Sequence, residues 1–194
     1  MKSKKRGFTV IEVVLVLMIA GLIFMMAFVT LPNLWASERD AERKAKVMEF
    51  VSDIKTYQTN NSRGALPTLN GNGPDVFTWS EARGYGAKDD SWRAFVRDYV
   101  SSDFEDPTGQ KVSFYVVNCL SGSGSNLSVA QTCAYQNNLA QVNVNAVPTI
   151  GVNNVMYVVI GSTCDGDRAV KSSNSRDVSA VYVLERAGRY CYNV

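Results

Sequence analysis

The sequence predicts an α+β fold in which one long N-terminal helix precedes a small antiparallel β-sheet. Residues 8–35 form an apolar run after a short basic segment, and residues 36–60 repeat apolar side chains at helical spacing. Later in the chain, short segments rich in Val, Tyr and Phe alternate with turn residues, as the strands of a small sheet do. A chain of 194 residues suits one such domain with an appended element.

Residues 1–7 form a short basic leader, and the run that follows is long enough to span a membrane. The basic residues of the leader are Lys2, Lys4, Lys5 and Arg6, and no charged residue occurs from Val13 to Ser37. About twenty helical residues, at about 1.5 Å each, cross the roughly 30 Å core of a bilayer. The run is too long for the apolar part of a signal peptide and lacks an A-x-A-like cleavage site. We therefore expect residues 8–35 to cross the membrane, with the leader in the cytoplasm and everything after residue 35 outside.

The helix is expected to continue as an amphipathic segment through residues 36–60. One face of this segment is apolar at steps of three and four, and no glycine or proline interrupts it. The residues of this face are Val47, Phe50, Val51, Ile54 and Tyr57. The simplest prediction is one helix from about Phe8 to about Tyr57, with Gly21 and Pro32 as its weak points.

Charged residues dominate the start of the amphipathic segment. Its basic members are Arg39, Arg43, Lys44 and Lys46, and its acidic members are Glu38, Asp40, Glu42 and Glu49. Two of the acids precede a lysine by four residues, which is the favourable orientation on a helix. We expect a solvated helix face here, and ion pairs to another subunit are the alternative.

Residues 61–194 are expected to form a globular head. A short helix is predicted at residues 90–100, because Trp92, Phe95, Val96 and Tyr99 share one helical face. Strands are predicted at Lys111–Asn118, Val155–Ile160 and Val178–Leu184, and a hairpin turn at Ala187-Gly188 leads into Arg189–Val194. Trp79 and Tyr85 are expected to pack with the aromatic residues of the short helix.

The composition excludes several kinds of active site. The chain has no histidine, which removes histidine bases, histidine-activated nucleophiles and histidine metal ligands. Asp165, Asp167 and Asp177 lie near Gly166, but their spacing lacks the EF-hand pattern, so an acidic turn is favoured over a calcium site. We therefore expect no catalytic residue, no metal and no cofactor. The formal net charge of +2 does not indicate DNA binding.

Four cysteines lie in the C-terminal half of the chain: Cys119, Cys133, Cys164 and Cys191. No C-x-x-C pair occurs, and an even number of cysteines beyond a membrane segment predicts disulfides in an oxidising compartment. Free buried cysteines are the alternative. Among the three connectivities we expect Cys119–Cys133, which would close a Ser/Gly loop. The second expected bridge, Cys164–Cys191, would tie the last strand to the segment after Ile160 across the sheet edge.

The sequence Lys4-Lys5-Arg6-Gly7-Phe8-Thr9-Val10-Ile11-Glu12 resembles the prepilin-peptidase recognition site of type IV pilins and their relatives. It combines a basic leader, a glycine at the end of the leader, a phenylalanine next, and a glutamate as fifth residue of the mature chain. The resemblance is strong over residues 4–60. It continues weakly in the turn Asp106-Pro107-Thr108-Gly109 and in Cys191, which is similar to the family's disulfide-bounded terminal segment. The resemblance implies a pilin-like fold, cleavage between Gly7 and Phe8, and N-methylation of Phe8.

Glu12 is an ionisable residue inside the apolar run, which is costly at the bilayer centre and less so near the interface. A carboxylate in this position can snorkel to the lipid headgroups. We favour a pairing between Glu12 and the α-amine of Phe8 on a neighbouring subunit. Such a pair would offset burial in a filament core and set the register between subunits.

The resemblance implies a structural subunit without catalysis, assembled into a type IV pilus for adhesion, twitching motility or DNA uptake. Its partners would be other pilin subunits, prepilin peptidase and the assembly machinery of the inner membrane. It would lie in the cytoplasmic membrane as a single-pass precursor and in a cell-surface filament after assembly. A type II secretion pseudopilin or a minor pilin is the nearest alternative; a membrane-tethered enzyme or binding protein is a distant one. The presence of Glu12 favours a body-forming subunit, and the four-cysteine head favours a pilin.

Overall fold

The computed structural model describes residues 7–61, 64–69, 75–100, 104–118, 154–186 and 188–194. The chain divides into two compact units, residues 1–38 and residues 39–194. We refer to the second of these as the head unit. The expected Cys119–Cys133 bridge lies outside the described residues.

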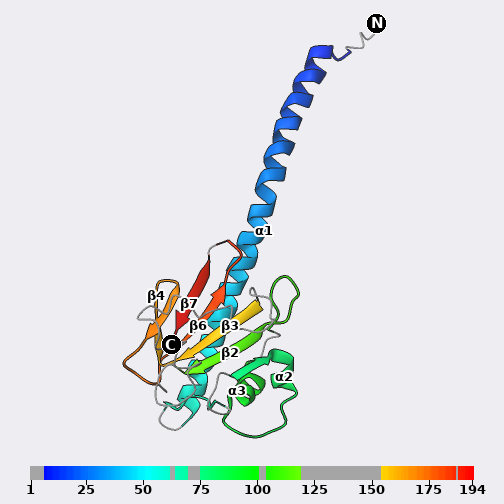
Figure 1. Cartoon of the computed structure of the whole chain (residues 1–194). Coiled ribbons are helices and arrows are strands. Elements are labelled where there is room, and N and C mark those ends of the chain that lie inside the picture. Colours follow the sequence, from blue (N-terminus) through cyan, green and yellow to red (C-terminus); the bar gives the residue numbers. More distant parts are fainter. Residues whose placement is uncertain (1–6, 62–63, 70–74, 101–103, 119–153, 187) are drawn as a thin grey trace. The chain divides into compact units, whose positions relative to one another are not determined.

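One long helix and a small sheet make up the fold (Figure 1). The helices are α1 (Val10–Asn60), α2 (Trp79–Arg83) and α3 (Trp92–Tyr99). The strands are β1 (Asp75–Thr78), β2 (Ser113–Asn118), β3 (Val155–Ile160), β4 (Ser162–Asp165), β5 (Arg168–Lys171), β6 (Val178–Val183) and β7 (Arg189–Asn193). A long helix followed by a small, mostly antiparallel sheet confirms the predicted α+β, pilin-like class.

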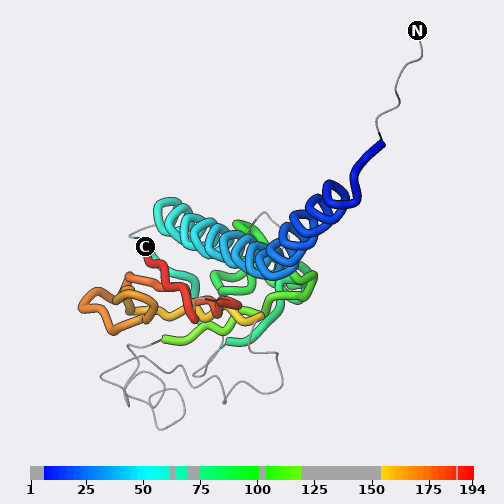
Figure 2. The backbone as a smooth tube through the Cα atoms, turned by 90° about the horizontal axis from the view of Figure 1, so that it is seen from above, coloured from blue at the N-terminus to red at the C-terminus, as the bar shows by residue number. Residues whose placement is uncertain are grey.

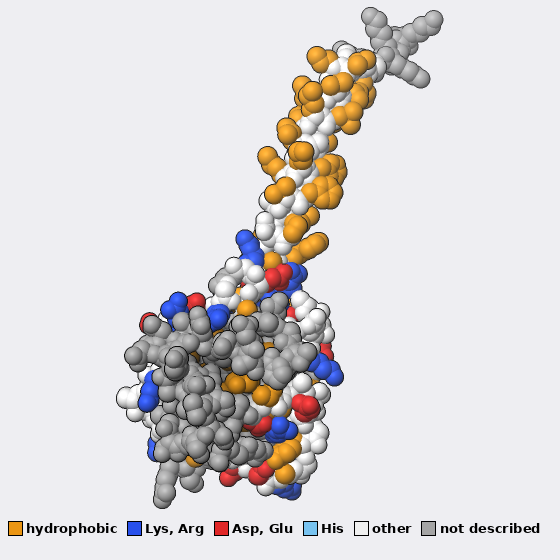
Figure 3. All heavy atoms as spheres, in the orientation of Figure 1, with side chains coloured by type: hydrophobic (Ala, Val, Ile, Leu, Met, Phe, Trp, Pro, Cys, Tyr) orange, Lys and Arg blue, Asp and Glu red, His pale blue; other side chains and the backbone are white. Residues whose placement is uncertain are grey.

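Helix α1 contains 51 residues and continues through Pro32. Proline has no N–H to donate to the preceding turn of a helix. Near Pro32, the Thr30 hydroxyl donates to the carbonyl of Met26 at 2.9 Å, and the Asn33 side-chain amide donates to the carbonyl of Val29 at 3.3 Å. By length and composition α1 could cross a membrane. Apolar side chains cover its N-terminal part on the face shown in Figure 3.

The part of α1 within the head unit packs by its predicted apolar face. Val47, Phe50, Val51, Ile54 and Tyr57 are all buried, as the spacing predicts. The ring of Phe50 stacks on that of Phe114 from β2 with centroids 5.2 Å apart. It also meets the ring of Phe95 from α3 edge-on at 5.8 Å. In Figure 2 the cyan part of α1 runs along one side of the sheet. The cluster is formed by buried side chains of α1, α2, α3 and the sheet.

Five strands form the main sheet in the order β1-β2-β3-β6-β7. Strands β2 and β3 are parallel, whereas the other neighbouring pairs in this sheet are antiparallel. The sequence led us to expect antiparallel strands alone. A parallel pair needs a crossover connection of a dozen or more residues, and the chain between Asn118 and Val155 is long enough to provide one. Every residue of β3 is buried, because this central strand has both faces covered.

Four elements are absent from the sequence predictions. Strand β1 leads directly into α2, whose N-terminus is closed by a capping box between Thr78 and Glu81. Strands β4 and β5 form a second, two-stranded sheet. The turn between them contains Gly166 at a φ of 63°, a conformation that glycine adopts without strain.

The second face of the main sheet carries its own apolar cluster. Tyr157, Val159 and Val181 are buried there beside Ala169 of β5 and Cys191 of β7. The two-stranded sheet of β4 and β5 therefore packs against this second face of the main sheet.

Candidate functional site

Gly7 and Phe8 precede helix α1 and lie in non-helical backbone. Phe8 is 89% exposed, and the space around Gly7 is open, since a Cβ added to it would meet no atom within 4 Å. The peptide bond between these two residues is therefore free of helical hydrogen bonding, as a protease substrate in an extended conformation needs to be. Residues 1–6 of the expected leader lie outside the described residues.

Thr9 and Glu12 close the N-terminus of α1 with a capping box. The Glu12 Oε2 atom accepts hydrogen bonds from the Thr9 backbone N–H at 2.9 Å and from the Thr9 hydroxyl at 2.8 Å. In return the Glu12 backbone N–H donates to Thr9 Oγ1 at 3.4 Å. This reciprocal arrangement supplies partners for N–H groups that the first turn of a helix leaves free.

The contact between Thr9 and Glu12 was not among the sequence predictions. The signal for it was present, because a threonine followed three residues later by glutamate, just before an apolar run, is the capping-box signature. Glu12 therefore has a role inside its own helix as well as the one expected between subunits.

Glu12 sits among apolar side chains at the start of α1. A shallow hollow on this unit is lined by Phe8, Ile11, Glu12, Val13, Leu15, Val16 and Leu17. All of these side chains are exposed in the single chain. A carboxylate in such surroundings is a site at which a cation carried by an apolar partner could bind.

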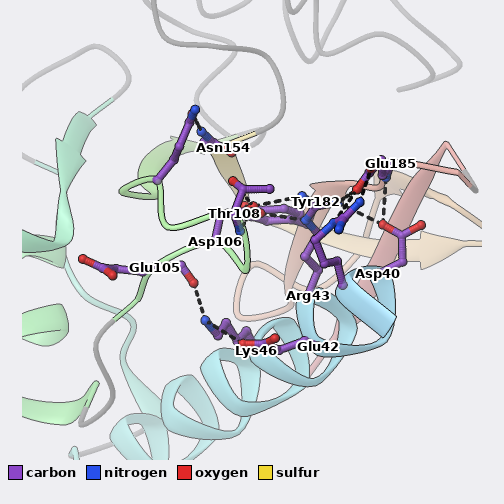
Figure 4. Close-up of polar contacts among 12 residues, drawn as sticks. Asp40, Glu42, Arg43, Lys46, Glu105, Asp106, Thr108, Asn154, Tyr182 and Glu185 are labelled. Carbon is purple, nitrogen blue, oxygen red and sulfur yellow. Dashed lines mark hydrogen bonds and ion pairs between the residues drawn. The ribbon is translucent and has the colours of Figure 1, made fainter. Parts of the chain in front are cut away.

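Arg43 is the centre of a buried polar cluster within the head unit (Figure 4). Its Nε and Nη2 atoms donate to the two carboxylate oxygens of Asp106, at 2.7 and 2.9 Å. Its Nη1 atom donates to Asp40 Oδ1 at 3.0 Å. Two-pronged pairing of a guanidinium with a carboxylate fixes both direction and distance. The helix is thus joined to the turn before β2.

Asp40 and Arg39 join the same helix to the turn between β6 and β7. The Asp40 carboxylate accepts from the backbone N–H groups of Glu185, at 2.8 Å, and Arg186, at 3.0 Å. Arg39 pairs with both carboxylate oxygens of Glu185, at 2.7 and 2.9 Å. We call these contacts, together with the Arg43–Asp106 pair, the helix clamp.

The Asp106 carboxylate is stabilised in its charged form. Its Oδ1 atom accepts from the backbone N–H and the hydroxyl of Thr108, and its Oδ2 atom accepts from the Tyr182 hydroxyl at 3.0 Å. Burial alone would raise the pKa of Asp106, but the bonds from Arg43, Thr108 and Tyr182 outweigh it and hold the pKa well below its usual range. Burial, followed by the nearby Asp106 charge, raises the pKa of Tyr182.

The helix clamp corrects the expectation of a solvated helix face. The side chains of Arg43 and Asp40 are only 4% and 7% exposed. Lys46 also turns inward, where it donates to the backbone carbonyl of Glu105. The prediction was wrong at these positions because it rested on charge: Asp40 and Arg43 continue, at steps of three and four, the face that is apolar from Val47 onwards. Helical spacing could have indicated their burial, but not their distant partners Asp106 and Glu185. Glu42 and Glu49 are exposed, as predicted.

Cys164 and Cys191 form a disulfide between β4 and β7, the pairing that the sequence analysis expects. The bridge ties the two-stranded sheet to the edge strand of the main sheet.

The acidic residues near Gly166 belong to turns. Asp177 accepts from the Ser172 hydroxyl at 2.5 Å and from the Asn174 side-chain amide at 2.8 Å. Asp165 is the last residue of β4 and lies opposite Arg168 of β5 in the strand register. Among the described residues, no group of three or more acidic or cysteine side chains is arranged to hold a metal ion.

Comparison with known proteins gives one match, which lies in the N-terminal segment. A family model described as the prokaryotic N-terminal methylation motif matches residues 2–28. No curated protein and no solved structure gives a significant match to the chain. The matched region contains Gly7, Phe8, Thr9 and Glu12. This motif supports a type IV pilin or pseudopilin, and it implies processing by prepilin peptidase and assembly into a pilus or pseudopilus.

The apolar start of α1 and the matched motif together fit a membrane-anchored precursor. The chain carries, at residues 2–28, the prokaryotic N-terminal methylation motif, which is the class III signal of type IV pilins and pseudopilins.

Proposed function

We propose that this chain is a structural subunit of a type IV pilus. A prepilin peptidase removes residues 1–7, Phe8 becomes the N-methylated first residue, and the mature subunit assembles into an extracellular filament. The observation that carries this proposal is the methylation motif at residues 2–28. With the proposed cleavage after Gly7, Glu12 would be the fifth residue of the mature chain.

The proposed cleavage follows from local chemistry. A peptidase at the cytoplasmic face of the membrane needs access to the backbone, and Gly7 has no side chain to obstruct it. The basic leader keeps this end of the chain in the cytoplasm, while residues 8–35 cross the membrane. The head unit then lies outside, where its Cys164–Cys191 disulfide is stable.

Assembly is proposed to use Glu12. Its carboxylate would pair with the α-ammonium group of Phe8 on a neighbouring subunit inside the filament. The apolar surface around Glu12 supports this role, because a charge pair is strongest when water is excluded from it. The pair would also fix the register of adjacent helices.

The finer role is proposed from the head unit. Its four cysteines, two of which form the Cys164–Cys191 disulfide, favour a pilus over a secretion pseudopilus, and adhesion, twitching motility or DNA uptake are the activities proposed for it. The subunit would not be an enzyme, since its task is polymerisation. Its partners would be further pilin subunits and the assembly machinery of the inner membrane.

Processing is tested by substituting Gly7. Because a Cβ at Gly7 would meet no atom within 4 Å, Gly7→Leu tests the access that the peptidase needs to the backbone. We expect the variant to keep its leader, as shown by intact mass, and to remain in the membrane fraction. Gly21→Ala is the matched control, since a Cβ at Gly21 also meets no atom within 4 Å. Normal cleavage of Gly7→Leu would contradict the proposed site.

The filament role is tested by shearing filaments from cells that express the chain and identifying their protein by mass. We expect a mature chain that starts at methylated Phe8. A chain found only in the membrane, together with secretion machinery and never in sheared filaments, would make it a pseudopilin. Met1 retained on assembled subunits would overturn the proposal altogether.

A further inference from the structure

We propose that Trp35 is a membrane-surface anchor: its indole ring binds the headgroup layer of the phospholipid bilayer at the outer end of the membrane-spanning part of α1. The inference rests on the proposed function, because it takes residues 8–35 to cross the membrane. It assigns a lipid contact to one side chain, which lies outside the matched residues 2–28.

Trp35 is the last exposed large apolar side chain along the start of α1. It is 57% exposed, and the series of exposed apolar side chains that begins at Phe8 ends with it. In the described chain from residue 39 onwards, the exposed large hydrophobic residues are Met48, Val76 and Tyr192, none of them more than 40% exposed. The apolar surface of the first unit therefore stops at Trp35.

The length of the helix places Trp35 at a boundary of the hydrocarbon core. Glu12 is the last charged residue before the apolar run, and Glu38 is the next one after it. Residues 13–34 rise by about 33 Å as a helix, which at an ordinary tilt of about 20° spans about 31 Å along the bilayer normal. This distance matches a hydrocarbon core of about 30 Å. With Glu12 at one boundary, Trp35 lies at the other.

The chemistry of tryptophan suits this boundary better than either hydrocarbon or water. Its ring is large and apolar, but its N–H needs an acceptor, so tryptophan gathers where lipid meets water. Within the described residues, no group accepts a hydrogen bond from the indole N–H of Trp35. The ester and phosphate oxygens of phospholipids can accept that bond while the acyl chains cover the ring. A phospholipid surface therefore fits both parts of the side chain.

Two polar residues just before Trp35 fit the same depth. The side chains of Thr30 and Asn33 are exposed. The Thr30 hydroxyl and the Asn33 side-chain amide donate to carbonyls of their own helix, which lowers the cost of placing them in lipid. Polar side chains cost least near the interface. The helix therefore becomes more polar as it approaches Trp35, as the end of a membrane span does.

The other two tryptophans of the chain make the anchor measurable by fluorescence. Trp92 is fully buried in the head unit, and Trp79 packs against its main core cluster. In the proposed topology the head unit lies outside the bilayer. Trp35 is then the tryptophan that a quencher on an acyl chain can reach.

The first experiment reconstitutes the full chain in phosphatidylcholine vesicles whose acyl chains carry bromine, either near the headgroup or near the chain end. Bromine quenches tryptophan fluorescence at short range. We expect stronger quenching by bromine near the headgroup, and loss of most of the quenching in Trp35→Phe. The matched control is Phe24→Trp in the Trp35→Phe background, which moves the probe about 16 Å towards the bilayer centre. It should reverse the order of the two quenchers.

Two results would overturn the anchor and spare the membrane span. Quenching of Trp35 that is strongest from the chain end would place the ring in hydrocarbon. No quenching of Trp35, with the Phe24→Trp control still quenched, would place the ring in water or against protein. Failure of the chain to enter the vesicles would instead refute the proposed membrane anchoring, and the present inference with it.

The second experiment tests whether Trp35 sets the depth of the chain. Ser37→Cys supplies a thiol for a membrane-impermeant maleimide in the same vesicles, and the chain without this substitution gives the background. Adding Trp35→Leu lengthens the apolar run, so we expect residue 37 to be drawn towards lipid and labelled several-fold more slowly. Trp35→Tyr keeps a ring with a polar end and should be labelled as fast as Ser37→Cys alone.

Phe24→Leu is the matched control for the second experiment, because it exchanges an exposed aromatic residue for leucine inside the apolar run. It should leave the labelling rate unchanged. Equal labelling rates in the Trp35→Leu and Trp35→Tyr variants would show that Trp35 does not fix the depth of the chain.

Discussion

The guanidinium group of Arg43 is almost completely buried, and three carboxylates surround it. It donates to Asp106 and Asp40 and lies 3.6 Å from Glu185. Removing one partner of a buried ion pair leaves the other charge without compensation, which is far more harmful than losing a surface pair. Arg43 is therefore a residue whose loss the head unit should feel strongly.

Arg43→Met is expected to lower the free energy of unfolding by about 3–5 kcal/mol, because Asp106 stays buried without its main partner. Urea unfolding of the detergent-solubilised chain, followed by tryptophan fluorescence, measures this. Arg168→Met is the control, since the Arg168–Asp167 pair is more than half exposed and worth little. Equal effects of the two substitutions would show that the helix clamp adds nothing to stability.

Asp53 is a second residue with an unusual environment. It lies on α1, and its Oδ2 atom is buried without a hydrogen-bond partner in the described part of the chain. Burial, and then the like charge of Glu49, raises the pKa of Asp53 from 3.8 to about 6. The folded chain therefore binds the Asp53 proton more tightly than the unfolded chain does.

The raised pKa of Asp53 makes the stability of the folded chain depend on pH. The contribution of Asp53 to stability is fully present below about pH 3.8 and is lost as the pH rises through about 6. Asp53→Asn should stabilise the chain at pH 7.5 and have little effect at pH 4. Thermal unfolding at a series of pH values measures this, with the exposed Asp167→Asn as the control. A uniform shift of the Asp53→Asn curve at all pH values would contradict the assignment.

At the scale of elements, the disulfide between β4 and β7 ties a small hairpin to an edge strand. Edge strands lack partners on one side, and terminal strands tend to fray. The bridge closes a loop with a sequence separation of 27 residues. In the chain-entropy view, such a bridge acts mainly by restricting the unfolded chain.

Replacing both Cys164 and Cys191 by serine should cost roughly 3–4 kcal/mol for a loop of this length. Protease digestion at increasing urea should then cleave the region from β4 to β7 before α1 and α3. Adding a reductant to the unaltered chain should reproduce part of this sensitivity and leave the serine variant unchanged. A double variant as resistant as the oxidised chain would exclude a stabilising role for the bridge.

The elements that the sequence predicts well are those with a strong local pattern. Strand β3 matches its predicted bounds because it is an uninterrupted apolar run. Helix α3 falls within the predicted residues 90–100 because its apolar residues repeat at helical spacing. Helix α2 has only five residues, too few for a period, although its Thr78–Glu81 capping box was visible. The β4–β5 hairpin has four-residue strands whose alternation is equally short.

The rest of the candidate site depends on contacts that sequence patterns cannot give. Gly7, Phe8 and Glu12 could be singled out because the motif that contains them is local. Arg43 lies four residues before Val47, in line with the buried face of α1, so the helical spacing could have indicated its burial. Its partner Asp106 lies 63 residues away, and helical spacing cannot identify it. Likewise, the parallel pairing of β2 with β3 is set by the path of the whole chain.

For the molecule as a whole, the head unit should fold without the apolar start of α1. The buried aromatic and aliphatic side chains of its main core begin at Val47 and come from α1, α2, α3 and the main sheet. All of the helix clamp lies within residues 39–194. A chain lacking residues 1–35 keeps every one of these contacts.

We expect that shortened chain to be soluble without detergent and to unfold in one cooperative transition. Its loss of stability on Arg43→Met should equal that of the full chain within about 0.5 kcal/mol, because distant changes add independently. Size-exclusion chromatography and thermal unfolding measure both properties. Aggregation of the shortened chain in an oxidising buffer would show that the head unit needs the apolar segment to fold.

The helix clamp also sets the time at which folding can finish. Asp40 meets the amides of Glu185 and Arg186, which lie 145 and 146 residues later in the chain. Closing so long a loop costs chain entropy before the contact contributes any favourable free energy. Contacts of this kind therefore form late in folding. In the proposed topology, the part of α1 within the head unit would reach the outer side of the membrane long before these partners. Asp40 would then stay in water until the β6–β7 turn has crossed, so the head unit could close only near the end of export.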